Sequence, residues 1–221
     1  MCKSIFFTCL AFLLFSCNEH VNDEDRDKAG RQTSNTTTTS DFKGVYYFDP
    51  ARSVFKDCKD MADYTVVDQT DSLEGKYIEL LPFRHEKEPV YVELSGYVNS
   101  QQDTLFVTNL QQISLLNTKA ACFAPVFQCT GTEPFWFLTI HPELNLLIFR
   151  DYSNMESHLF AYQAPLTKGN KSVFLAKSVG GEMIEVVVTK ETCSDGMSDL
   201  VYDYKAEISF RGQQWKGCAV R

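Results

Sequence analysis

The sequence predicts an all-β protein made of antiparallel β-barrel structure that follows a disordered tether. From Phe42 onward, short segments rich in Val, Tyr, Phe and Thr recur and are separated by Pro, Gly, Asp or Asn. No stretch longer than about eight residues shows the apolar spacing of a helix. At this strand spacing, the roughly 180 residues after the tether allow one large barrel or two small ones.

The amino terminus has the pattern of a signal peptide. Lys3 precedes an apolar run from Ile5 to Phe15, which at about 11 residues is shorter than the roughly 20 needed to span a bilayer as a helix. The run ends in Leu14-Phe15-Ser16-Cys17, which resembles a bacterial lipobox. The resemblance implies removal of residues 1–16 and lipidation of Cys17; the alternative is an ordinary secretory signal with a chance cysteine.

Residues 17–41 are expected to be a lipidated Cys17 followed by a disordered tether. Asn18–Asp41 is polar, contains the run Thr36–Thr39 and lacks apolar periodicity. The membrane, reached through the lipid anchor, is therefore an expected partner. The expected location is extracytoplasmic, at the outer membrane. The acidic tract Asp23–Asp25 is compatible with the cell surface and with a plain tether on the periplasmic face.

The expected strands fall into two groups, with a break near Asn117–Pro125 where no strand pattern is present. The first group is Lys43–Phe48, Tyr64–Val67, Tyr77–Leu81, Val90–Val98 and Thr104–Val107. The second group is Phe135–Ile140, Leu146–Asp151, Ser172–Ser178, Ile184–Thr189, Tyr202–Phe210 and Gln214–Ala219. Asp103–Leu116 is the best helix candidate and could equally form two strands.

Charge and motif content argue against several classes of function. The chain carries 21 Lys and Arg against 29 Asp and Glu, a net charge of −8, which disfavours nucleic-acid binding. The four histidines, at positions 20, 85, 141 and 158, lie in no motif that would place a base beside a nucleophile or a metal. We therefore expect no enzymatic activity, no cofactor and no metal site.

The number of cysteines available for disulfides is odd. Of eight cysteines, Cys2 and Cys9 leave with the signal peptide and Cys17 would carry lipid. Five thiols then remain in an oxidising compartment, where paired thiols become disulfides. An odd number of cysteines permits many pairings, and the counts alone do not choose among them.

The first group of strands resembles the OB-type carboxy-terminal domain of NlpE-like envelope lipoproteins. The similarity rests on Gly44–Tyr47, Phe55–Cys58, Tyr64–Val66, Leu73–Tyr77 and Val92–Gly96. It implies an OB-like domain over residues 42–122, a Cys58–Cys122 disulfide, and a role in envelope-stress sensing or protein contact.

The second group of strands resembles an uncharacterised envelope β-domain family with GNEPFW and CSDGMSD…GCA motifs. The matching segments are Gly131–Trp136, Cys193–Asp199 and Gly217–Ala219. The resemblance implies a lipocalin-like barrel over residues 123–221 and a Cys193–Cys218 disulfide. Cys129 would then remain a buried reduced thiol.

Four residues are candidates for facing a ligand: Glu133, Trp136, Asp195 and Asp199. Glu133 and Trp136 could line a ligand mouth, although core packing is favoured for Trp136. Asp195 and Asp199 could offer oxygens to a cation, although a turn at Asp195 is favoured.

The hypothesis from the sequence is a non-enzymatic, lipid-anchored envelope protein that acts by binding, with an envelope protein as its partner. The alternatives are an inhibitor of lysozyme-type enzymes and a thiol- or metal-handling protein that uses Cys129.

Overall fold

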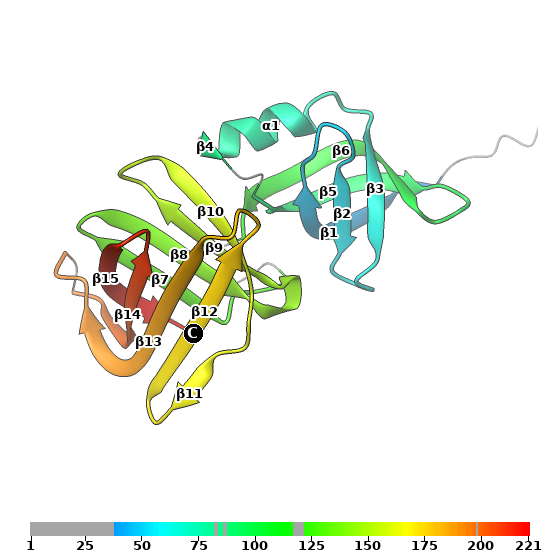
Figure 1. Ribbon diagram of the computed structural model, residues 1–221. Helices are drawn as coiled ribbons and strands as arrows, with labels where there is room; N and C mark the ends of the chain where they lie inside the picture. Colours follow the sequence, from blue (N-terminus) through cyan, green and yellow to red (C-terminus); the bar gives the residue numbers. More distant parts are fainter. Residues whose placement is uncertain (1–37, 82–83, 86–87, 117–121, 198) are drawn as a thin grey trace, which may run out of the picture. The chain divides into compact units, whose positions relative to one another are not determined.

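The computed structural model describes residues 38–81, 84–85, 88–116, 122–197 and 199–221. The predictions for the signal peptide, Cys17 and most of the tether lie outside these residues. The described chain forms two closed antiparallel-rich barrels, of five and of eight strands, with one short α-helix (Figure 1). The all-β prediction is therefore confirmed, and of the two alternatives the chain adopts two small barrels.

The first barrel has the strand order β1-β2-β3-β6-β5 and closes through β1 and β5. Its parallel pair is β3 with β6, and the other neighbours are antiparallel. Helix α1 (Leu73–Leu80) and β4 (Arg84–His85) lie between β3 and β5 in the chain. The barrel strands are β1 (Ser40–Tyr47), β2 (Val54–Asp57), β3 (Asp63–Asp68), β5 (Val90–Val98) and β6 (Thr104–Leu115).

Three expectations for this barrel are corrected. The segment Tyr77–Leu81 was expected to be a strand and instead belongs largely to α1, because Leu73 and Tyr77 are four residues apart and both are buried on one face. Asp103–Leu116 forms one long strand, β6, neither a helix nor two strands. Strand β1 begins at Ser40, two residues inside the expected tether, since Ser40 pairs with Gly96 of β5.

The second barrel is an antiparallel meander closed by two residue pairs between β10 and β12, Phe160 with Ser178 and Ala161 with Lys177. Strand β11 (Leu166–Lys168) adds to β12, and β4 pairs in parallel with β10. A 3-10 helix, η1, covers Pro142–Leu144. The barrel strands are β7 (Phe127–Thr132), β8 (Phe135–His141), β9 (Leu146–Asp151), β10 (Glu156–Ala161), β12 (Lys171–Ser178), β13 (Met183–Ser194), β14 (Val201–Phe210) and β15 (Gln213–Val220).

Alternating side chains fill the interior of the second barrel. The aromatic rings of Phe149, Phe160, Phe210 and Trp215 pack at centroid distances of 5.1–6.0 Å, in T-shaped contacts. Cys129 lies in the same cluster as a free, buried thiol. Both disulfides implied by the family resemblances are present, Cys58–Cys122 and Cys193–Cys218, with Cα–Cα distances of 5.7 and 5.6 Å.

A buried ion pair connects the segment before β5 to the outer face of the second barrel. The Arg150 guanidinium, on β9, donates to both carboxylate oxygens of Glu88, and Ser157 Oγ donates to Glu88 Oε2 at 2.7 Å. Apolar side chains from both barrels pack beside it, among them Val45 and Ile148. No helix within the described residues is long and apolar enough to cross a membrane.

Candidate functional site

A hollow on the outer face of the second barrel brings together the three motif segments of its sequence. We call it the motif pocket; its volume is about 440 Å³, and its charged lining residues are Glu133, Asp195, Lys205 and Lys216. Glu133 lies in the β7–β8 turn and Asp195 follows β13, whereas the lysines lie on β14 and β15. Thr132 and Asp195, for example, are 63 residues apart in the sequence, so only the fold places these segments together.

The Cys193–Cys218 disulfide explains why the loop after β13 covers this face. Lys205 pairs with Cys218 across β14 and β15, and directly opposed residues project from the same face of a sheet. The bond from Cys218 to Cys193 therefore draws the loop over the outer face that carries Lys205. Thr132 Oγ1 also donates to the Asp195 carbonyl oxygen at 3.4 Å, which attaches the loop to β7.

The structure places two of the four sequence candidates in the motif pocket and two outside it. Glu133 and Asp195 line the motif pocket. Trp136 does not face a ligand: it is 1% exposed within the barrel core, because a Cβ is absent at Gly131 and the indole ring packs over that glycine. Asp199 is exposed and is not among the residues that line the pocket. Of the two alternatives for Trp136, the structure therefore excludes the ligand-facing one and has the core packing that the sequence favoured.

The carboxylate of Asp195 shapes the loop. Its Oδ1 accepts the backbone N–H of Met197 at 3.0 Å, and its Oδ2 accepts the Tyr202 hydroxyl at 3.2 Å. Gly196 follows at φ +71°, a backbone conformation that glycine adopts without strain. These contacts support the turn interpretation over a cation site, and the described residues contain no group of three or more His, Cys, Asp or Glu side chains suited to a metal.

A second surface lies at the barrel end that carries four hairpin turns, those following β7, β9, β12 and β14. We call it the turn surface, and define it by the exposed apolar residues Phe135, Tyr152, Met155, Val179 and Met183. Phe135 is 56% exposed and Val179 is fully exposed. Single exposed apolar side chains are common, but a group of them on one surface is typical of an interaction site. The Tyr152 N–H donates to the Phe135 carbonyl at 3.1 Å and joins two of these turns.

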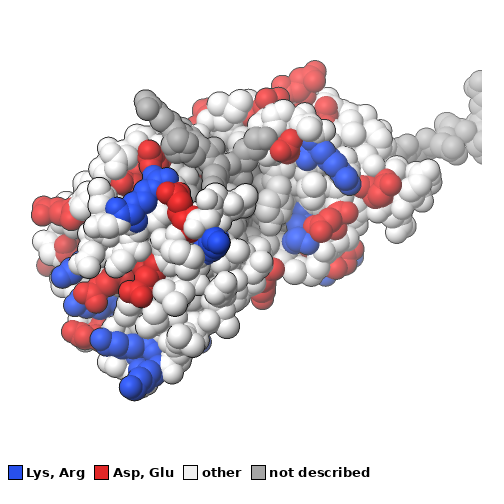
Figure 2. All heavy atoms as spheres, in the orientation of Figure 1, with Lys and Arg blue, Asp and Glu red and all other residues white. Residues whose placement is uncertain are grey.

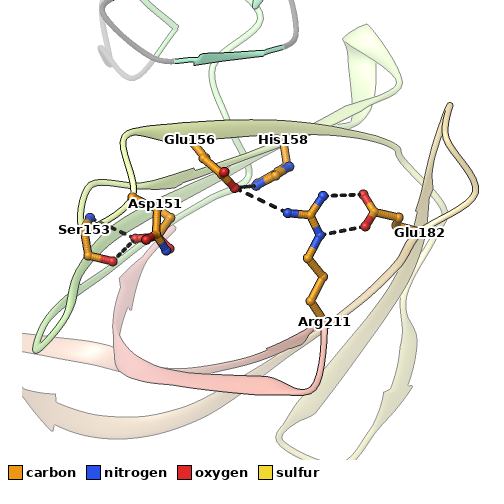
Figure 3. A network of polar contacts seen from close by, with 7 residues as sticks. Asp151, Ser153, Glu156, His158, Glu182 and Arg211 are labelled. Atoms are coloured by element: carbon orange, nitrogen blue, oxygen red, sulfur yellow. Dashed lines mark hydrogen bonds and ion pairs between the residues drawn. The ribbon is translucent and has the colours of Figure 1, made fainter.

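A polar network stiffens the turn surface (Figure 3). Arg211, in the β14–β15 turn, donates to both carboxylate oxygens of Glu182 at 2.6 and 2.9 Å and lies 3.3 Å from Glu156. His158 Nε2 lies 3.2 Å from the same Glu156 oxygen, Oε2. Arg211 therefore connects the β12–β13 turn with β10, next to the barrel seam that only two residue pairs close.

The network also fixes the charges of its members. The hydrogen bond from Arg211 lowers the pKa of Glu182, and burial together with the Arg211 charge lowers the pKa of His158. Burial opposes ionisation of Asp151 in the β9–β10 turn, but hydrogen bonds from Ser153 and Asn154 prevail and lower its pKa. At neutral pH the carboxylates of Glu182 and Asp151 are ionised and His158 is neutral.

Sequence reasoning missed Lys205, Lys216 and the members of the network. Lys205, Lys216, Glu156, Glu182 and Arg211 are charged residues in strands or turns, and their local pattern is that of ordinary solvent-exposed surface. Arg211 and Gly212 form the tip of the β14–β15 hairpin, at φ +50° and +75°. The partners of Arg211, Glu182 and Glu156, could not be predicted from the sequence, because they lie 29 and 55 residues away from it in the chain.

Comparisons with known proteins match the first barrel. Residues 36–130 match a family model described as the NlpE C-terminal OB domain. This confirms the resemblance of the first strand group to that domain. Searches of curated proteins and of solved structures find no match.

Proposed function

We propose that the chain is a non-enzymatic, lipid-anchored protein of the cell envelope that acts by binding another envelope protein through the turn surface. The observation that supports this function is the group of five exposed apolar side chains at one barrel end, where Arg211 also links the β12–β13 turn with β10. Aromatic, Met and Arg side chains are enriched in protein interfaces. A stiff surface also loses little entropy on binding.

The envelope address is supported by the family match and by the apolar run that ends at Cys17. On the face shown in Figure 2, Lys and Arg side chains are interspersed with Asp and Glu and form no extended basic area, in keeping with a protein partner. The thiol- or metal-handling alternative gains no support from Cys129, because burial raises the pKa of its thiol to about 12.

The experiment is crosslinking in intact cells with the lipidated full chain. Val179→Asp and Met183→Asp each place a charge on the turn surface and should reduce the crosslinked partner by about tenfold or more. Leu166→Asp is the matched control, since Leu166 is 72% exposed on β11 and lies outside this surface.

A partner band of equal intensity in the wild type and both turn-surface variants would exclude this surface. Equal loss in the Leu166 control would show that added charge, not location, disrupts binding. Loss of palmitate-analogue labelling in Cys17→Ser tests the lipid anchor separately.

A further inference from the structure

The motif pocket presents two kinds of charge on separate structural elements. The ammonium groups belong to Lys205 and Lys216 on the adjacent strands β14 and β15. The carboxylates of Glu133 and Asp195 belong to the β7–β8 turn and the loop after β13. With two positive and two negative groups, the charged lining is formally neutral; we call the two lysines the lysine side and the two carboxylates the acidic side.

The lysine side is accessible to a ligand. Glu207 pairs with Lys216 across the two strands, so Lys216 projects from the same face as Cys218 and Lys205. Lys205 Nζ lies 3.5 Å from Glu207 Oε1, with both side chains about 40% exposed, and exposed pairs of this kind contribute little. Among the described residues Lys216 has no carboxylate within ion-pair distance.

The acidic side differs between its two members. Asp195 is already held by Met197 N–H and the Tyr202 hydroxyl. Glu133 is exposed and makes no hydrogen bond or ion pair to the described residues, so its carboxylate is the group that faces an incoming ammonium.

The pocket also exposes main chain. A Cβ at Gly217 would overlap the Thr130 carbonyl, and one at Gly131 would overlap the Trp136 ring, so close packing keeps both positions free of side chains. A volume of about 440 Å³ lies within the range of small-molecule sites.

We infer that the motif pocket binds a short zwitterionic peptide, with its carboxylate toward Lys205 and Lys216 and its amino group toward Glu133. A singly charged ligand would leave one side of the pocket without a counterion, whereas a zwitterion satisfies both. The pocket shares the β7–β8 turn with the turn surface, but none of the five residues that define that surface lines the pocket, so its occupancy does not depend on the function proposed for the turn surface.

The test is titration of the full chain with trialanine, N-acetyl-trialanine and trialanine amide, followed by the amide NMR shifts of Gly131, Gly196 and Gly217. Trialanine should give saturable shifts at these glycines. Each capped peptide, which lacks one terminal charge, should bind about tenfold more weakly, because one charge-assisted hydrogen bond is lost.

Two variants assign the charges. Lys216→Gln should weaken trialanine about tenfold and leave the binding of trialanine amide unchanged. Glu133→Gln should also weaken the binding of trialanine about tenfold, and it should leave the binding of N-acetyl-trialanine unchanged. Both side chains are exposed, so neither change disturbs the core. Lys168→Gln and Glu143→Gln are matched controls outside the pocket and should have no effect.

Absence of saturable shifts with trialanine overturns the inference. So does equal binding of the three peptides, which would show that the terminal charges are not recognised. An equal effect of Lys216→Gln and Lys168→Gln would likewise show that net charge, and not the pocket, governs the binding.

Discussion

Acidification should destabilise the second barrel through His141. This residue is 1% exposed on β8, with Nδ1 2.9 Å from the Phe123 carbonyl oxygen and Nε2 without a hydrogen-bond partner among the described residues. Burial lowers the pKa of His141 from 6.5 to about 4; the Phe123 carbonyl opposes this shift and the Arg150 charge adds to it. The folded protein therefore keeps this imidazole neutral at pH values where the unfolded chain protonates it.

The size of the effect follows from linkage. A shift of one pKa unit corresponds to about 1.4 kcal/mol, so the full contribution of His141 to the free energy of unfolding is about 3 kcal/mol. Because the folded pKa is depressed, this contribution is complete above pH 6.5 and is lost as the pH falls toward 4. His158, whose pKa is also lowered, adds to the decline in the same direction.

Urea unfolding followed by tryptophan fluorescence measures this decline in one barrel. The chain has two tryptophans, Trp136 and Trp215, and both are buried in the second barrel. His141→Gln retains an N–H donor but does not titrate, so the fall in unfolding free energy between pH 6.5 and 4.5 should be smaller than in the wild type.

Thr139→Val is the control for this experiment. Thr139 is a buried neighbour on β8 whose hydroxyl has no partner among the described residues, and valine matches its shape. The control should keep the wild-type dependence on pH. If His141→Gln also keeps the wild-type dependence, the buried neutral imidazole is not its source and the reasoning fails.

Three further predictions concern stability and reactivity. Glu88→Ala leaves the Arg150 guanidinium buried without its counterion and should lower the free energy of unfolding in urea by about 3–5 kcal/mol. The double variant Glu88→Leu/Arg150→Met should restore most of this loss. A small effect of Glu88→Ala alone would argue against the buried pair. Gly131→Ala should lower the free energy of unfolding by about 1–3 kcal/mol, because the added Cβ overlaps the Trp136 ring. Gly75→Ala in α1, where the space is open, should raise it by about 0.5–1 kcal/mol. Equal effects of the two changes would contradict the packing described. Cys129 should resist iodoacetamide in the native protein and react in urea, and rapid native labelling would show that it is not buried.

The strand pattern was predictable where each strand buries one face. Val90–Val98 and Leu146–Asp151 were predicted with the bounds that the structure has, since alternation or a compact apolar run fixes such segments. Helix α1 was missed because it has only eight residues, too few for its apolar spacing to be told from that of a strand, and its position depends on contacts with the rest of the chain. The Leu73 N–H donates to Asp68 Oδ2, and the Tyr77 hydroxyl donates to the Glu88 carbonyl.

The candidate site was predictable only in part. Glu133 was identified because it precedes the aromatic residues Phe135 and Trp136, and Asp195 because its loop also carries Asp199 and could offer oxygens to a cation. The lysines opposite them were not, because a lysine in an alternating strand has the same local pattern whether it faces a pocket or open solvent. Their role depends on the Cys193–Cys218 bond, which determines the face of the sheet that the loop covers.

The apolar run Leu146–Phe149 indicates a strand that is buried on both faces, an inference that the sequence analysis did not draw. A strand with one solvated face alternates, whereas a continuous apolar run is typical of a strand buried on both faces. In the structure Leu147 and Phe149 face the barrel core, and Ile148 packs in a separate cluster with Val45 of the first barrel. A charged residue at the next outward position, Arg150, must then be buried and requires a carboxylate from outside its own barrel. The run and the arginine that follows it therefore implied a covering surface with an acidic residue, although not that Glu88 would supply it.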